Sequence, residues 1–232
     1  MVPPKSMVGN DLAILVPFLI TVCIHLIVSL ISSAPAWMKG LTKILPIICL
    51  CMFVVHNGKK FPCSHHSLLK LLAGLVFSAV GDVLLLNDDH ELFIGGGAMF
   101  ALAHCLYTWA FGFKPLNLRA GSLMAIVVGL GLIFLSIFSK IWQVLLLCCY
   151  CILIGVMSWR ANAEVLFHNQ RTAAKVTGAV GAVLFMVSDF TLATNLLCFP
   201  VAYDRAIVMT TYYMAQLFIT VGIVRDNKKK SD

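Results

Sequence analysis

Eight long apolar stretches constrain this sequence more than any other feature. A helix that crosses a lipid bilayer needs about 20 mainly apolar residues, and the 232-residue chain is 60% hydrophobic and only 12% charged. Soluble domains carry roughly 25% charged residues, and a soluble globule of this composition would expose large apolar patches. The sequence therefore predicts an all-α polytopic membrane protein with a single transmembrane domain over 1–232.

The eight predicted spans follow one another with short connections. They cover about residues 12–31, 41–55, 68–86, 93–111, 122–138, 141–159, 176–197 and 206–224. The second span is short, and a tight turn joins the fifth to the sixth. The basic segment 225–232 follows the last span as a tail.

Basic residues are distributed unevenly between the two faces that eight spans define. Thirteen of the 17 Lys and Arg residues, including Lys59 and Lys60, fall on the face that carries both termini, and the acidic loop NDDHE (87–91) falls on the other. Cytoplasmic loops are enriched in Lys and Arg. We therefore expect both termini in the cytoplasm. The tail Lys228, Lys229 and Lys230 is most simply a topology anchor and also fits an ER-retrieval signal, and we expect the endoplasmic reticulum as the membrane. The net charge of +7 is explained by this topology and does not indicate a nucleic-acid partner.

Two aspartates stand inside apolar spans. Asp82 lies in LLKLLAGLVFSAVGDVLLL (68–86), and Asp189 lies in VLFMVSDFTL (183–192). A carboxylate at bilayer depth costs a few kcal/mol or more and usually serves a function. With a helical rise of about 1.5 Å per residue, both lie about 18–21 Å from the cytoplasmic side. Asp82 and Asp189 are therefore the first candidates for a functional site.

The segments around the two aspartates resemble each other. VFSAVGD (76–82) and VLFMVSD (183–189) match at an offset of 107 residues, which equals four spans. We interpret this as two parallel four-helix repeats, spans one to four and five to eight, related by an axis along the membrane normal.

Other polar groups lie at a similar depth on other spans. They are His25 on the first span, His104 and Tyr107 on the fourth, and Tyr212 and Gln216 on the eighth. In hydrocarbon such groups must face inward and pair with each other. Interhelical hydrogen bonding explains the last four at least as well as chemistry does, and packing is the commoner role for an isolated His25.

Several chemistries fit this sequence poorly. A catalytic zinc site needs about three protein ligands and an open position, yet only His25 and His104 lie in spans and no HExxH motif occurs. No GxSxG nucleophile elbow occurs either. We expect no metal and no cofactor. Three functions stay open: acid–base hydrolysis by two carboxylates, proton-coupled transport of a small lipid-like solute, and non-catalytic lipid binding.

Four segments of the chain resemble the YhhN-like family of membrane proteins. They are GLVFSAVGDVLLL (74–86), FALAHCLYTWAFG (100–112), VLFMVSDFTLATN (183–195) and TTYYMAQLFI (210–219). Their GD, HxxY, SD and YYxxQ elements occur together and in order, and the resemblance covers nearly the whole chain. Animal members of the family are lysoplasmalogenases, and the segments LVPF and SSAPAW resemble the A-type more than the B-type paralogue.

The resemblance implies hydrolysis of the vinyl ether bond of a lysoplasmalogen, which gives a fatty aldehyde and a glycerophospho-head-group. This reaction begins with proton transfer to an alkenyl carbon, and two carboxylates can act as proton donor and cation stabiliser. We therefore expect Asp82 and Asp189 to be the catalytic pair. The residues expected to orient the pair or to position water are His104, Tyr107, Tyr212, Gln216 and His25.

Candidates for the lipid phosphate are the basic residues Lys70, Lys114, Arg160 and Lys175. The expected partners are the membrane-embedded lysoplasmalogen substrate and a second copy of the chain in a homodimer.

Overall fold

The computed structural model is a bundle of eight α-helices, which confirms the predicted fold class. It describes residues 5–31, 35–58, 65–86, 89–167 and 171–231; Lys59, Lys60 and residues 87–88 of the acidic loop lie outside these ranges. The helices are α1 (Lys5–Leu30), α2 (Ala36–Gly58), α3 (His65–Leu84), α4 (His90–Phe111), α5 (Leu118–Ser136), α6 (Ile141–Asn162), α7 (Ala173–Leu197) and α8 (Asp204–Ser231). All eight are long and apolar enough to cross a membrane.

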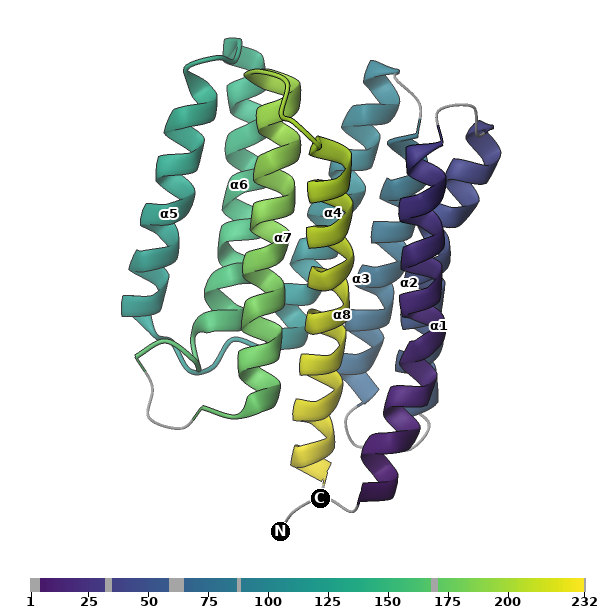
Figure 1. The fold of residues 1–232 in the computed structure, drawn as a ribbon. Coiled ribbons are helices and arrows are strands. Elements are labelled where there is room, and N and C mark those ends of the chain that lie inside the picture. Colours follow the sequence, from purple (N-terminus) through teal and green to yellow (C-terminus); the bar gives the residue numbers. More distant parts are fainter. Residues whose placement is uncertain (1–4, 32–34, 59–64, 87–88, 168–170, 232) are drawn as a thin grey trace.

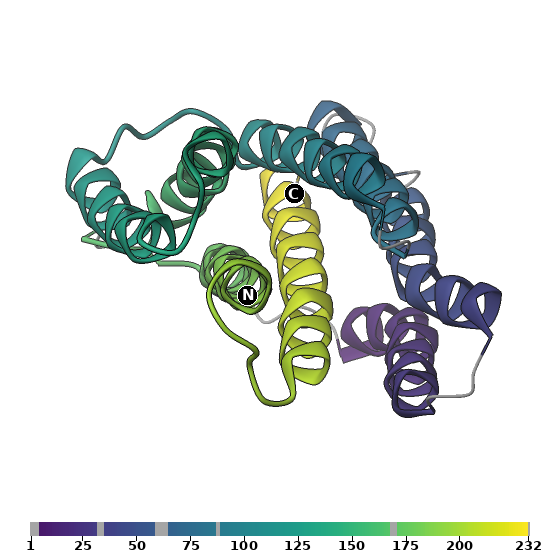
Figure 2. The same cartoon turned by 90° about the horizontal axis from the view of Figure 1, so that it is seen from above.

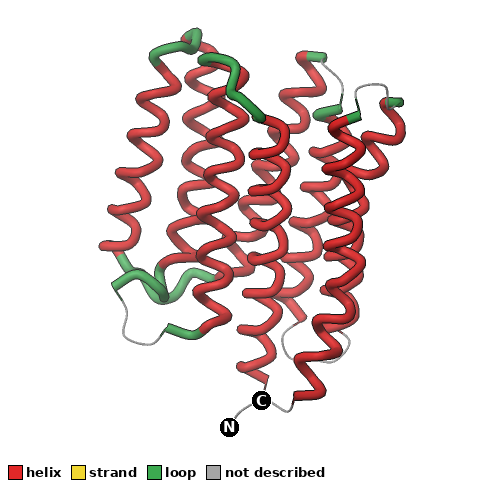
Figure 3. The backbone as a smooth tube through the Cα atoms, viewed as in Figure 1, coloured by secondary structure: helices red, strands yellow, loops and turns green. Residues whose placement is uncertain are grey.

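The helices run roughly parallel to one axis, and the described loops lie at the two ends of the bundle (Figure 3). α1 begins and α8 ends at the same end (Figure 1), which we call the terminal end; the other is the opposite end. Seen from above, α8 lies between α1–α4 on one side and α5–α7 on the other (Figure 2). α8 packs against α7 and also contacts α1, α2 and α3. It therefore joins the two halves of the chain.

Two helices differ from the spans predicted for them. α2 has 23 residues and is not short, because it begins at Ala36 and continues to Gly58. Lys43 near its start is buried in the bundle. α8 has 28 residues and continues to Ser231, so the basic tail extends the last helix.

Polar residues mark where several of the helices begin. The Asp89 carboxylate accepts hydrogen bonds from the backbone N–H groups of Glu91 and Leu92 at the start of α4. The Thr172 hydroxyl accepts one from the N–H of Lys175 at the start of α7. Such side chains satisfy the free N–H groups of a first helical turn, and they fix where these two helices begin.

Glycines allow close packing at the helix pairs that carry the aspartates. A Cβ atom on Gly222 of α8 would lie 2.6 Å from the backbone nitrogen of Gly178 in α7. A Cβ atom on Gly81 of α3 would lie 2.8 Å from the ring of Phe100 in α4. Small residues at helix contacts let backbones approach closely inside a membrane. These close contacts fix the register of α7 against α8 and of α3 against α4, and Asp189 and Asp82 lie on α7 and α3.

Candidate functional site

Asp82 of α3 belongs to a buried ion pair with Lys43. The Lys43 Nζ atom lies 3.2 Å from one carboxylate oxygen of Asp82, and the Tyr212 hydroxyl donates to the other oxygen at 2.7 Å. Lys43 also donates to the backbone carbonyl of Asp82 at 3.4 Å. Asp82 is only 1% exposed. A buried charge is stable when it is paired and its remaining oxygens accept hydrogen bonds, and Lys43 and Tyr212 supply these contacts to Asp82.

The backbone of α2 near Lys43 is held by its neighbours. The Tyr213 hydroxyl donates to the carbonyl of Lys43 at 2.9 Å. His25 of α1 lies with its Nδ1 atom 3.2 Å from the Thr42 hydroxyl, and its ring packs edge-on against Tyr213. His25 thus supports the position of Lys43, and among the described contacts it touches neither aspartate.

Asp189 of α7 has a different set of partners. The Tyr150 hydroxyl of α6 donates to its Oδ2 atom at 2.6 Å. The Nε2 atom of His104 in α4 lies 2.9 Å from the same hydroxyl and 3.4 Å from Oδ2. The Asp189 side chain is 19% exposed, so it is accessible in a way that Asp82 is not.

The hydrogen bonds define the tautomer of His104 when its imidazole is neutral. A tyrosine hydroxyl has one proton, and Tyr150 uses it toward Asp189. His104 therefore donates its Nε2 proton to the Tyr150 oxygen, and Nδ1 becomes the acceptor. Nδ1 is buried and has no hydrogen-bond partner among the described residues. His104, Tyr150 and Asp189 thus form a chain of polar groups that ends in an accessible carboxyl.

Tyr107 and Gln216 pair with each other and not with the aspartates. The Tyr107 hydroxyl donates to Gln216 Oε1 at 2.8 Å and lies 3.3 Å from the Ser78 hydroxyl. These residues come from α4, α8 and α3, and all three are fully buried. Their geometry is that of an interhelical hydrogen-bond network.

Aromatic rings separate the two carboxylates. The Phe185 ring packs edge-on against His104, with centroids 4.8 Å apart, and against Tyr212, with centroids 5.5 Å apart. Phe100 packs against both Phe185 and Tyr212. Within the part of the chain that the structure describes, no hydrogen bond joins Asp82 to Asp189. The structure therefore brings the predicted site residues together as two neighbouring clusters instead of one shared carboxyl pair.

The two clusters are related in the way that the predicted repeat requires. Asp82 and Asp189 are 107 residues apart, and so are their partners Lys43 and Tyr150. Each aspartate takes one partner from the preceding helix and one from the last helix of the other half, Tyr212 on α8 or His104 on α4. This exchange of partners supports the interpretation of two parallel repeats.

Lys43 and Tyr150 are the site residues that sequence reasoning missed. Lys43 lies at the start of the second predicted span, where a lysine commonly flanks an apolar run, and does not stand out there. Tyr150 lies in an apolar, cysteine-rich run and does not stand out. The repeat carries the signal that could have found them, because the offset of 107 that relates the two aspartates also relates these two residues.

Basic residues proposed for the lipid phosphate make other contacts at the terminal end. Arg160 donates to the carbonyls of Gly112 and Pro115 at 2.8 and 2.9 Å. Lys175 pairs with Glu164, and Lys70 lies over the Trp109 ring. Arg160, Lys175 and Glu164 border a small cavity of about 30 Å³. These contacts hold helix ends and loops together.

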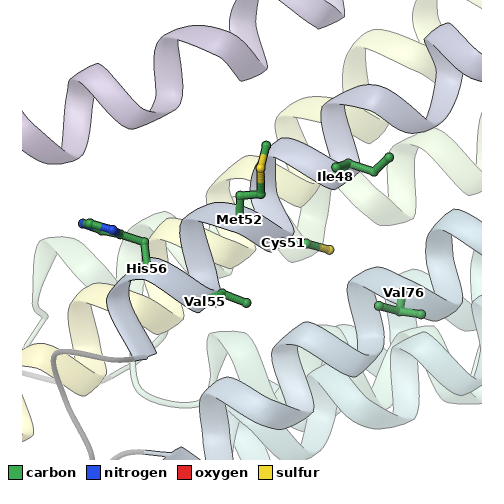
Figure 4. A pocket seen from close by; sticks show the side chains of 6 residues that line it. All are labelled: Ile48, Cys51, Met52, Val55, His56 and Val76. Carbon is green, nitrogen blue, oxygen red and sulfur yellow. The ribbon is translucent and has the colours of Figure 1, made fainter.

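A larger apolar groove lies between α2 and α3. It has a volume of about 540 Å³, and its lining residues are Ile48, Cys51, Met52, Val55, His56 and Val76 (Figure 4). None of these side chains belongs to either carboxylate cluster. The described residues hold no group of three or more His, Cys, Asp or Glu side chains placed to bind a metal ion.

Comparison with known proteins reveals relatives along the whole chain. Residues 38–223 match the YhhN family. The bovine protein named lysoplasmalogenase TMEM86A is 40% identical over all of this chain and 97% of its own length. Its human counterpart is 39% identical over 98% of this chain and 95% of its own. Human lysoplasmalogenase TMEM86B is 33% identical over 93% and 88%. The A-type relatives are the more similar, as predicted. No solved structure was found that resembles the chain.

Proposed function

Since this chain belongs to the YhhN family, we propose that it hydrolyses the vinyl ether bond of lysoplasmalogens inside the membrane. The observation that carries the proposal is the full-length similarity to proteins named lysoplasmalogenases. The two carboxylate clusters in the bundle are suited to this reaction, which needs a proton donor, a group that stabilises positive charge, and water. The proposed products are a fatty aldehyde and glycerophosphoethanolamine or glycerophosphocholine.

The reaction proceeds in three balanced steps. A carboxylic acid transfers its proton to the outer alkenyl carbon, and the double-bond electrons form the new C–H bond, which leaves an oxygen-stabilised cation. Water then adds to the cationic carbon and returns a proton to the carboxylate. In the resulting hemiacetal the hydroxyl proton passes to the ether oxygen, the bond from carbon to that oxygen breaks, and aldehyde and glycerol hydroxyl are released.

We assign the proton-donating role to Asp189. Its partners, Tyr150 and His104, are groups that can be neutral, and a carboxyl beside neutral partners can carry a proton. Its Oδ2 atom accepts from Tyr150, so a proton on Oδ1 can face the substrate. Asp189 is also the more accessible of the two acids.

We assign the ionised role to Asp82. The ammonium of Lys43 holds its negative charge, and Tyr212 fixes its second oxygen. The Phe185 ring packs against both Tyr212 and His104, so the two carboxylates lie in neighbouring clusters. A fixed negative charge in a low-dielectric interior stabilises a cation that develops nearby. Asp82 therefore acts on the oxocarbenium-like state through its field.

The test is aldehyde release by purified protein in detergent supplied with lysoplasmenylethanolamine. The proposed hydrolase turns over without a second compartment, whereas a proton-coupled transporter needs two. Stoichiometric aldehyde and glycerophosphoethanolamine support the proposal. Saturable binding of the lysolipid without aldehyde formation contradicts it and favours a lipid-binding protein.

We place the protein in the membrane of the endoplasmic reticulum with both termini in the cytoplasm. The uneven distribution of Lys and Arg supports this orientation, as does the common end at which α1 begins and α8 ends. The predicted homodimer has no support from the fold or from the relatives and stays a prediction.

A further inference from the structure

The two carboxylate clusters lie closer to the opposite end of the bundle than to the terminal end. Asp189 is eight residues from the end of α7 at Leu197, which is about 12 Å. Lys43 is seven residues from the start of α2 at Ala36, which is about 10 Å. Asp82 is only two residues from the end of α3 at Leu84.

Toward the terminal end the distances are about twice as long. Asp189 is 16 residues from Ala173, which is about 24 Å. Lys43 is 15 residues from Gly58, which is about 22 Å. A bilayer has a hydrocarbon core of about 30 Å, so both acids lie in the half of the membrane that faces away from the termini. His104 contacts Asp189 from the side that is nearer the terminal end.

The covalent structure of a lysoplasmalogen limits where its phosphate can be during reaction. Five single bonds join the ether oxygen to the phosphorus atom, which span at most about 7 Å. Arg160 is ten residues from Tyr150, or about 15 Å along α6, and Lys175 is 14 residues from Asp189, or about 21 Å along α7. A phosphate bound at the terminal end would leave the vinyl ether out of reach of Asp189.

A cation at the right distance lies on the other side of the acids. Lys39 is four residues before Lys43 in α2, so the two share a helix face with Lys39 one turn nearer the opposite end. Lys39 is three residues from Ala36, or about 5 Å from the opposite end of α2, and Asp189 is about 12 Å from the corresponding end of α7. The difference in depth, about 7 Å, matches the length of the glycerol link. Lys39 is half-buried at this position.

We propose that the enzyme takes its lysolipid from the membrane leaflet opposite its termini and that Lys39 binds the substrate's phosphate on that side. This inference rests on the proposed function. It requires the vinyl ether to move about 10 Å inward from the opposite end, whereas a lipid from the terminal leaflet would have to move about twice as far with its charged head group in hydrocarbon, which is costly.

The first test uses sealed vesicles in which the protein has a known orientation. Protein with a tag after Asp232 is reconstituted so that most vesicles hold one molecule, and vesicles with the tag outside are removed by affinity capture. Lysoplasmenylethanolamine is added to both fractions from outside, where it enters the outer leaflet. The uncaptured vesicles should release aldehyde at least about tenfold faster than the captured ones, and detergent should remove the difference.

Equal rates in the two sealed fractions, or faster release by the captured vesicles, overturn the sidedness. Both fractions are also assayed in detergent. A preparation that is inactive there overturns the proposed function and this inference with it, whereas an active preparation with the wrong sidedness overturns this inference alone.

The second test compares two lysines in detergent. Lys39→Gln should raise KM for the lysoplasmalogen about tenfold, the scale of one hydrogen bond to a charged group, with little change in kcat, and Lys39→Arg should restore it. Lys229→Gln is the matched control, since Lys229 is an exposed lysine at the terminal end of α8, and its KM should be unchanged. Equal effects of the two Gln variants, or no effect of Lys39→Gln, overturn the assignment of Lys39.

Discussion

The two carboxylate clusters have the same architecture but differ in one partner. Each aspartate is contacted from the preceding helix and from the last helix of the other half. At equivalent positions 107 residues apart, Asp82 meets the ammonium of Lys43, whereas Asp189 meets the phenol of Tyr150. An ammonium holds a carboxylate in its charged form, and a phenol donates one hydrogen bond without fixing the charge.

Exposure follows the same division. The Asp82 side chain is 2% exposed and the Asp189 side chain is 19% exposed. A buried, paired charge acts on the reacting atoms through its electrostatic field. An accessible group beside neutral partners can gain and lose a proton during a reaction. The difference between the clusters fits the proposed roles, in which Asp82 is a fixed charge and Asp189 is a reactive acid.

Asp189→Asn should have the largest effect on turnover. The amide can still accept from Tyr150 but cannot supply a proton, and general acid–base catalysis contributes about 10²–10⁴-fold. Aldehyde release should fall by at least that factor while the melting temperature in detergent changes little, because the site is accessible. A variant that keeps turnover within a few-fold of the native rate would show that Asp189 is not the proton donor.

Asp82→Asn should lower both turnover and stability. Removing one partner of a buried ion pair leaves Lys43 uncompensated, at a cost of about 3–5 kcal/mol. The double variant Lys43→Met with Asp82→Leu removes both charges, so the thermal midpoint should recover while aldehyde release does not. Recovery of activity together with stability would mean that Asp82 serves only to neutralise Lys43.

Tyr150→Lys should make the Asp189 cluster resemble the Asp82 cluster, which has a lysine at the equivalent position. An ammonium beside Asp189 would hold it as a carboxylate, so kcat should fall by about 10²-fold or more if the acid is lost. Tyr150→Phe is the matched control, because it removes one hydrogen bond worth about 0.5–1.5 kcal/mol and should cost at most about tenfold. Similar kcat values for the Lys and Phe variants would contradict the proposed difference between the clusters.

The fold could be predicted from the sequence because hydrocarbon imposes a strong length rule on apolar helices. Asp82 and Asp189 could be singled out for a related reason, since charges are rare at that depth. The partners of the aspartates were harder to predict. Lys43 stands at the edge of its predicted span, and its side chain is buried only where α2 packs against α3 and α8.

Pairing between distant helices is the part that local patterns do not encode. Tyr107, Gln216, Tyr212 and His104 lie at similar depths, yet helix rotation and register decide which of them contacts a carboxylate. Tyr212 and His104 do so, whereas Tyr107 and Gln216 bond to each other. Their neighbouring positions in the HxxY and YYxxQ elements do not distinguish these outcomes.

Tyr107→Phe should lower the stability of the protein and have the smallest effect on turnover among these variants. The change leaves Gln216 Oε1 without the hydroxyl that donates to it, and a buried group that loses its partner costs about 1–3 kcal/mol. The thermal midpoint should therefore fall while kcat stays within about twofold, because this network touches neither aspartate. Tyr212→Phe provides the contrast on the adjacent network, since it removes a hydrogen bond to Asp82 itself and should lower kcat. If Tyr107→Phe lowers kcat as much as Tyr212→Phe does, the Tyr107 network also acts on the reacting carboxylates, and the division into two clusters is incomplete.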